Sequence, residues 1–267
     1  MPQISSNGIS INYETAGQGD PLLLIMGFAM PGAAWVPMLS FLSGFQSIYF
    51  DNRGTGLSDK PAGAYTVAAM ADDASNLIRG LGLERVRVYG ISMGGMIAQE
   101  LALRHPEQVS MMVLGCTTPG GTEAARASDE VLQSLVVGSK LMSLDPDAGI
   151  DMVLPLLYPA EFIAAHPEIK QFMRLGMTLA PQTPPETADK LAAGLMEFDT
   201  CDRLHQIECP VMIVHGGKDI IVPPRNAALI KERIRNAELF MIPEAGHNYP
   251  AADPVRIHQR ITTWLRN

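Results

Sequence analysis

Short runs rich in apolar and β-branched residues recur along the chain, at 22–26, 86–91, 109–114, 211–215 and 238–242. Runs of this kind are typical of strands that are buried on both faces of a parallel sheet. Between them, apolar residues return at helical spacing, at 35–43, 66–81, 93–104, 226–234 and 254–265. This alternation predicts an α/β fold, with a mostly parallel sheet and helices on both of its faces.

The alternation stops in the middle of the chain. From 119 to 204 the sequence gives no strand pattern, and its helical segments are separated by prolines and rich in methionine. Strands and helices then resume in the same rhythm. We therefore predict a single α/β core made of 1–118 and 205–267, with a helical cap at 119–204 inserted after the strand at 109–114.

The charge and the cysteine content of the chain limit which partners it can bind and in which cellular compartment it is expected. The 267 residues carry a formal net charge of −8 without a Lys/Arg cluster, so we expect neither nucleic acid nor a membrane surface as a partner. Cys116, Cys201 and Cys209 have no metal-ligand spacing. Cys201 and Cys209 could pair on spacing alone, but we expect buried free thiols. With no signal-peptide pattern at the N-terminus, a cytoplasmic protein is expected.

Ser92 lies in a Gly-x-Ser-x-Gly sequence, between the strand at 86–91 and the helix at 93–104. A serine at such a sharp turn has a strained backbone and crowded neighbours, and Gly90 and Gly94 relieve the crowding because they lack Cβ. The first amides of the helix then face any negative charge that forms at the hydroxyl. With 24 glycines in the chain, a simple glycine-rich turn is the alternative. The strand before and the helix after favour a catalytic nucleophile.

A serine hydroxyl needs a base, which a carboxylate in turn orients. His247 follows the strand at 238–242, and Asp219 follows the strand at 211–215. Both loops leave the carboxyl edge of a parallel sheet, where Ser92 also lies, so we predict that the three side chains meet. Asp51 could also reach this edge, but we expect it to pair with its neighbour Arg53.

Acyl transfer also needs two donors for an oxyanion. We expect one from the backbone amide of Met93 and the other from the amide of Phe28, which follows the strand at 22–26. Gly27 would let the backbone turn there, although an ordinary turn glycine explains it equally well. Gly54-Thr55-Gly56 lacks the third glycine of a dinucleotide-binding loop, so we expect no cofactor and no metal.

Together these residues resemble the α/β-hydrolase superfamily, specifically compact bacterial esterases and lactonases with a helical cap. The motifs that carry the resemblance are Met26-Gly27-Phe28, Asp51-Asn52-Arg53-Gly54-Thr55-Gly56-Leu57-Ser58, Gly90 to Gly95, Gly217-Lys218-Asp219 and Gly246-His247. Among the relatives, the 3-oxoadipate enol-lactonase and polyketide methylesterase groups are the most similar in character. Met26 departs from the histidine common before the oxyanion glycine. Haloalkane dehalogenases and epoxide hydrolases have aspartate where this chain has Ser92, which argues against their chemistry.

The predicted cap would lie over Ser92 and supply an apolar wall for the substrate. Candidate substrate-binding residues are Gly27, Trp35, Met142, Leu156, Phe162, Met173, Met177 and Met196. The alternative is that the methionines pack the core of the cap itself.

The resulting hypothesis is a serine hydrolase that cleaves a carboxylic ester or lactone of a small, mainly apolar molecule, with water as the second substrate. Two alternatives stay open. The same triad serves carbon–carbon bond hydrolases, lyases and perhydrolases, and a non-catalytic binding protein can share the fold. The sequence also leaves open whether the chain forms a homodimer.

Overall fold

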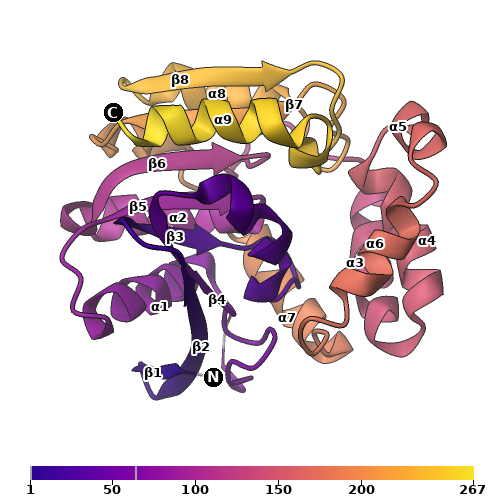
Figure 1. Ribbon diagram of the computed structural model, residues 1–267, viewed down its shortest axis with the longest axis horizontal. Helices are drawn as coiled ribbons and strands as arrows, with labels where there is room; N and C mark the ends of the chain where they lie inside the picture. Colours follow the sequence, from indigo (N-terminus) through magenta and orange to yellow (C-terminus); the bar gives the residue numbers. More distant parts are fainter. Residues whose placement is uncertain (1, 64) are drawn as a thin grey trace.

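A computed structural model of the protein describes residues 2–63 and 65–267. These residues form one eight-stranded sheet in the order β1-β2-β4-β3-β5-β6-β7-β8 (Figure 1). The strands β3 to β8 run parallel, and β1 and β2 are antiparallel to their neighbours. Their bounds are β1 (Gln3–Ser6), β2 (Ile9–Ala16), β3 (Asp20–Ile25), β4 (Phe45–Phe50), β5 (Val86–Ile91), β6 (Val109–Gly115), β7 (Val211–Gly216) and β8 (Ala237–Ile242).

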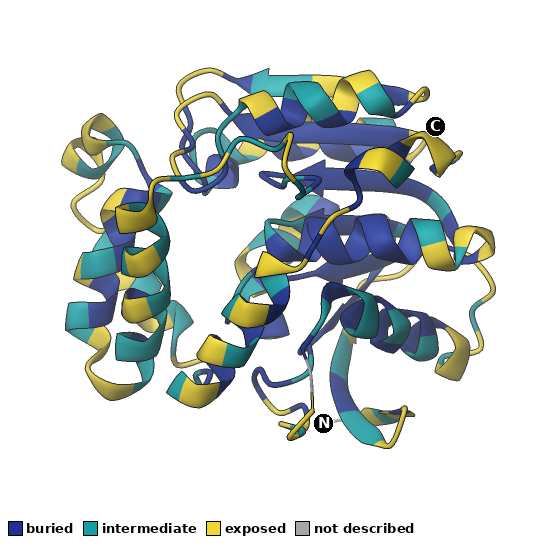
Figure 2. Cartoon of the chain, turned by 180° about the vertical axis from the view of Figure 1, so that it is seen from behind, coloured by how far each residue is buried: buried dark blue, intermediate teal, exposed yellow. Residues whose placement is uncertain are grey.

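Helices cover both faces of the sheet, as the α/β prediction required. On one face, α1 (Val67–Gly80), α2 (Met93–Arg104) and α8 (Arg225–Arg233) pack against the strands. On the other, η1 (Gly32–Leu42) and α9 (Pro254–Leu265) do so. Figure 2 shows the buried sheet between helices whose outer faces are exposed. Short 3₁₀ turns complete the core, at η2 (Pro106–Gln108), η3 (Cys201–Gln206) and η4 (Tyr249–Ala251).

Local chemistry explains where the elements begin and end. Thr66 caps α1, since its hydroxyl accepts a hydrogen bond from the Ala69 amide at 3.1 Å. The predicted helix at 35–43 is a 3₁₀ helix instead, running over Gly32–Leu42. Pro37 lies inside it and has no N–H to donate to an α-helical turn.

Five helices lie between β6 and β7, within the predicted cap: α3 (Asp129–Leu144), α4 (Pro146–Leu157), α5 (Ala160–Ala165), α6 (Ile169–Gly176) and α7 (Pro185–Met196). In Figure 1 the arrows of β6 and β8 point towards the group α3–α6, so this group lies beyond the carboxyl ends of the strands. Met142, Ile150 and Val153 form a small apolar core within the group. The division of the chain at 118 and 204 remains a prediction.

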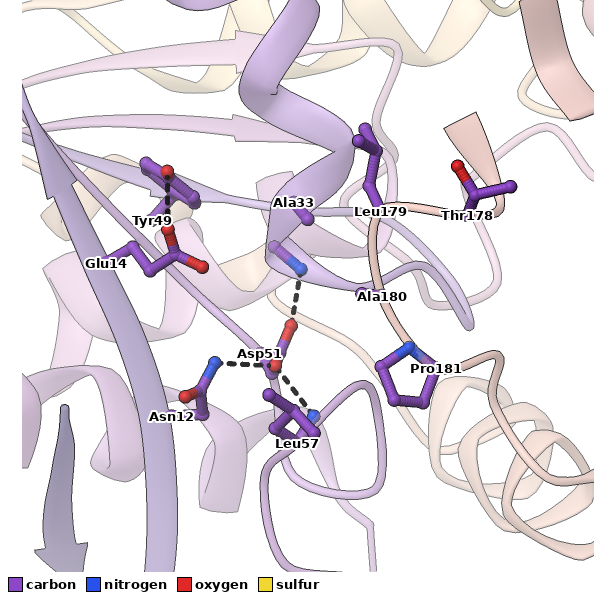
Figure 3. A pocket seen from close by; sticks show the side chains of 11 residues that line it. Asn12, Glu14, Ala33, Tyr49, Asp51, Leu57, Thr178, Leu179, Ala180 and Pro181 are labelled. Carbon is purple, nitrogen blue, oxygen red and sulfur yellow. Dashed lines mark hydrogen bonds between the residues drawn. The ribbon is translucent and has the colours of Figure 1, made fainter. Parts of the chain in front are cut away.

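The expected pairing of Asp51 with Arg53 is wrong. Arg53 instead donates to Asp73 on α1, with Nε 2.6 Å from Oδ2 and Nη2 2.9 Å from Oδ1. Asp51 accepts hydrogen bonds from the amides of Gly32 and Leu57 and from the Asn12 side chain, at 2.7 to 2.9 Å (Figure 3). Its carboxylate therefore connects β2, η1 and the loop after β4 at the carboxyl end of β4.

The cysteines and the lengths of the helices bear on two further expectations, free thiols and the absence of a membrane span. Cys116, Cys201 and Cys209 are free thiols, the first two buried and Cys209 half-buried. Of the helices in the described ranges, none has both the length and the apolar character needed to cross a bilayer.

We predict that Asp51→Ala lowers the free energy of unfolding by about 2–3 kcal/mol, because the buried donors of Asn12 and Gly32 lose their acceptor together and the Leu57 amide loses it too. Urea denaturation followed by circular dichroism measures the change. The control is Asp20→Ala, which removes an exposed ion pair with Arg87 and should cost about 0–1 kcal/mol. Equal losses in the two variants would contradict the assigned role of Asp51.

Candidate active site

Ser92 joins β5 to α2 and has the strained backbone that the sequence predicted, with φ 54° and ψ −121°. Its glycine neighbours are required by close contacts with backbone atoms. A Cβ at residue 90 would lie 2.2 Å from the carbonyl oxygen of Gly94, and one at residue 94 would lie 2.1 Å from that of Ile25. Only glycine fits at either position, so the turn that raises the Ser92 hydroxyl is fixed by sterics.

The structure brings Ser92, His247 and Asp219 together. His247, in the loop after β8, has its Nε2 3.0 Å from the Ser92 Oγ. Asp219, in the loop after β7, has its Oδ2 2.7 Å from the His247 Nδ1. Because an ionised carboxylate only accepts, His247 donates from Nδ1 and its Nε2 is left to accept from the serine hydroxyl. The arrangement can transfer the Ser92 proton to His247.

The electrostatics of the pair favour a charged imidazole. Burial raises the pKa of the Asp219 carboxyl, but His247 and His215 more than offset it and hold that pKa well below its ordinary value. Burial alone lowers the pKa of His247. The Asp219 carboxylate, with a smaller contribution from Cys116, raises the His247 pKa well above 6.5. An imidazolium that forms at His247 is therefore stabilised.

The loop after β3 runs directly against the serine. A Cβ on Gly27 would lie 3.2 Å from the Ser92 Cβ, so the Gly27 backbone touches the nucleophile candidate. Asn52 donates from Nδ2 to the Met26 carbonyl at 3.2 Å, and this hydrogen bond fixes the loop in place. The Met93 amide belongs to the first turn of α2, where backbone N–H groups have no helical acceptor. The oxyanion role of the Phe28 and Met93 amides stays a prediction.

Comparison with known proteins identifies the family of the chain. The model of the alpha/beta hydrolase fold matches residues 20–250. The chain belongs to the alpha/beta hydrolase family. It is 30% identical over 258 residues to a protein named putative carbamate hydrolase RutD from Caulobacter sp. (strain K31), covering 94% of this chain and 92% of that one.

Solved structures of other hydrolases superpose over nearly the whole chain. A thermophilic esterase from Thermogutta terrifontis is 28% identical with a TM-score of 0.82, covering 99% of this chain and 97% of that one. The enol-lactonase from Burkholderia xenovorans LB400 has a TM-score of 0.85 and covers 100% of both chains. At 22% identity, the enol-lactonase shows a shared fold only.

The substrate-binding candidates of this hydrolase separate into two groups. Leu156 packs against Ile221 and Val222 in the loop of Asp219. Phe162 stacks on Tyr158, and the Tyr158 hydroxyl accepts from Asn248, the residue after His247. Leu156 therefore contacts the loop of Asp219, whereas Phe162 is connected to the loop of His247 through Tyr158.

The other candidates lie elsewhere. Met142, Met173 and Met177 pack in the apolar core of the insertion, which is the alternative that the sequence allowed. Trp35 is 1% exposed and packs on Tyr89 in the core of the hydrolase, with ring centroids 4.9 Å apart. Met196 is 66% exposed on α7. A methionine-rich sequence does not reveal whether a given methionine lines a pocket, packs in the core or lies on the surface, because all three locations tolerate an apolar side chain.

A cavity of about 370 Å³ lies between β2, β4, η1 and residues 178–181 (Figure 3). Ser92, His247 and Asp219 are not among its lining residues. The Tyr49 hydroxyl in its wall donates to Glu14 at 3.0 Å, and burial together with this contact raises the Tyr49 pKa to about 12. In residues 2–63 and 65–267, no three His, Cys, Asp or Glu side chains are grouped to hold a metal ion.

Sequence reasoning passed over two residues that support the site. Asn52, which holds the loop of Gly27, lies in the motif Asp51-Asn52-Arg53 that supports the family resemblance, so its position in the sequence indicated a role near the site. His215 is the last residue of the strand expected at 211–215, and its side chain lies beside Asp219, with Nε2 3.4 Å from Oδ2. In the sequence, the one indication of this contact is that a histidine stands four residues before the predicted acid, Asp219.

We predict that the pKa of His247, measured from its imidazole resonances in an NMR titration, lies above 6.5 and falls below that value in Asp219→Asn. The amide carries no charge to offset the burial that lowers the His247 pKa. The resonances of His258, a buried histidine on α9, serve as the internal control and should titrate alike in both proteins. An unchanged His247 midpoint would show that Asp219 does not control its charge.

Proposed function

We propose that this hydrolase cleaves a carboxylic ester or lactone of a small, mainly apolar molecule through an acyl-enzyme at Ser92. The observation that carries the proposal is the unbroken series of contacts from the Ser92 Oγ to the His247 Nε2 at 3.0 Å and from the Nδ1 to Asp219 at 2.7 Å. A hydroxyl, an imidazole and a carboxylate in this order form the arrangement that activates a serine nucleophile.

In the first half of the reaction, the Ser92 Oγ attacks the substrate carbonyl while His247 takes the hydroxyl proton on Nε2. Asp219 holds the imidazole in the required tautomer and stabilises the imidazolium. Negative charge develops on the carbonyl oxygen, and the amides of Phe28 and Met93 would donate to it. His247 then gives its proton to the leaving alcohol oxygen as the carbon–oxygen bond breaks.

In the second half, water attacks the acyl-enzyme. His247 takes a proton from this water, which adds to the acyl carbon, and returns the proton to the Ser92 Oγ as the acid leaves. For a lactone, the alcohol and the acid are two ends of one product. Each step uses only side chains and backbone amides of this chain together with water.

The choice of ester substrates has two supports. From the insertion, Leu156 packs on the loop of Asp219, and Tyr158, which stacks on Phe162, contacts Asn248 beside His247; we take these apolar side chains to favour an apolar group. The esterase from Thermogutta terrifontis also shares 28% of its sequence with this chain. We further propose a cytoplasmic location, which three free cysteines support.

A carbamate is the second candidate substrate, because a relative that is 30% identical is named a putative carbamate hydrolase. Its carbonyl would pass through the same tetrahedral geometry at Ser92. Three assays distinguish the ester, carbamate and carbon–carbon hypotheses. They measure hydrolysis of p-nitrophenyl acetate, hydrolysis of a phenyl carbamate and cleavage of a β-diketone. Turnover of the β-diketone alone would remove the ester proposal.

We predict that Ser92→Ala lowers kcat for p-nitrophenyl acetate by at least about a thousandfold, the scale expected for loss of a nucleophile. A fluorophosphonate probe should label the wild-type protein at Ser92, as located by peptide mass spectrometry, and should leave the variant unlabelled.

The matched control is Ser110→Ala on β6, where the hydroxyl only donates to the Val86 carbonyl. This variant should keep both turnover and labelling. A folded wild-type protein that neither hydrolyses the acetate nor reacts with the probe would favour a non-catalytic binding protein.

A further inference from the structure

A second buried histidine lies beside the candidate acid, at the end of β7. His215 is 0% exposed, and its Nε2 lies 2.8 Å from the carbonyl oxygen of Val222. The same Nε2 lies 3.4 Å from the Asp219 Oδ2, the oxygen that contacts His247. The mechanism proposed above gives this imidazole no step, although its side chain touches the site.

The contacts of His215 determine its protonation. A carbonyl oxygen only accepts hydrogen bonds, so Nε2 must carry a proton and donate it to Val222. Nδ1 is fully buried and has no hydrogen-bond partner in the described part of the chain. A proton on Nδ1 would be a buried donor without an acceptor, which is costly. The ring is therefore neutral, with its single proton on Nε2.

This proton adds one more hydrogen bond to the turn that carries Asp219. The amides of Ile221 and Val222 donate to the Asp219 Oδ1, each at 2.9 Å. The Val222 carbonyl accepts from the His215 Nε2, which lies 3.4 Å from Oδ2. Both ends of the Val222 residue are thus held, and the turn that carries the carboxylate cannot rotate without breaking one of these bonds.

We infer that His215 is a positioning residue for Asp219: it fixes the turn at 219–222 and orients Oδ2 towards His247. This inference rests on the proposed function and deepens it. Because the ring is neutral, it orients the carboxylate without cancelling the negative charge that His247 needs. A side chain that merely fills space in the core would have no need of the Nε2 proton.

The test compares variants that keep or lose this proton. His215→Gln places an amide N–H close to the position of Nε2, whereas His215→Leu keeps most of the volume and loses the donor. His258→Leu is the matched control, because His258 is also buried and donates to a carbonyl, that of Pro254, on α9. Unfolding by urea measures the stability of each variant separately from its activity.

Two readouts report on the site. The first is the rate constant for phosphonylation of Ser92 by a fluorophosphonate, with kcat and KM for p-nitrophenyl acetate beside it. We expect His215→Leu to lower the labelling rate and kcat by about 10- to 100-fold, with KM within about twofold, since a misplaced catalytic group costs rates of this size. We expect His215→Gln to recover most of the rate and His258→Leu to keep it.

The second readout is the downfield NMR signal of the His247 Nδ1 proton at low pH. It should broaden or move upfield in His215→Leu and persist in His258→Leu, because only the first change frees the carboxylate that holds this proton. Should His215→Leu fail to fold, His215→Asn takes its place. The shorter amide of asparagine corresponds in position to Nδ1, so it leaves Val222 without its donor.

The outcomes separate this inference from the proposed function. If the wild-type protein is not labelled at Ser92, the proposed function fails, and the inference that rests on it fails too. If the wild type is labelled and folded His215→Leu reacts at the wild-type rate with an unchanged NMR signal, only the positioning role is overturned. A loss of rate in His215→Leu that His258→Leu matches would also overturn it, since the effect would then be one of core packing.

Discussion

The hydrogen bond between Ser92 and His247 joins two residues that are 155 positions apart, and it depends on the parallel register of the sheet. Ile91 pairs with Gly115 and Gly115 with Val214, so β5 and β6 end at the same level and β7 runs two residues further, to Gly216. The Ser92 amide then donates to the Gly115 carbonyl, and the Cys116 amide donates to that of Val214. The loops that carry Ser92, Asp219 and His247 all leave from this carboxyl edge, which is why residues far apart in the sequence come into contact there. A shift of one residue in this register would separate the hydroxyl from the imidazole.

Burying the Asp219 carboxylate at the edge is costly unless donors surround it. The backbone amides of Ile221 and Val222 donate to Oδ1, and His247 donates to Oδ2. His215 lies close to Oδ2 as well. The result is a charge that stays ionised where water is excluded, and therefore acts strongly on His247. The same dry surroundings explain why the His247 pKa is raised although burial opposes it.

Some of these features could be predicted from the sequence and others could not. The turn at Ser92 is local: Gly90 and Gly94 are readable because any Cβ there would strike the backbone. Asp219 and His247 follow from strand ends, since parallel strands share one edge. The partner of Arg53 is Asp73 on the face of α1, which adjacency in sequence could not reveal. The neutral state of His215 depends on which atoms surround Nδ1, and strand periodicity indicates only that the side chain is buried.

The insertion is not independent of the loops that carry Asp219 and His247. The Asn248 amide donates to the Leu157 carbonyl at 3.0 Å, and Gly246 packs so closely on this carbonyl that a Cβ would lie 2.8 Å from it. Lys218, next to Asp219, pairs with Glu161 on α5, while Leu156 covers Ile221 and Val222. The junction of α4 and α5 therefore contacts the loop of the acid and the loop of the base at once. Movement of this junction away from the sheet would break the Asn248 bond and uncover the turn at 219–222, so the position of the insertion and the alignment of the three side chains are mechanically linked.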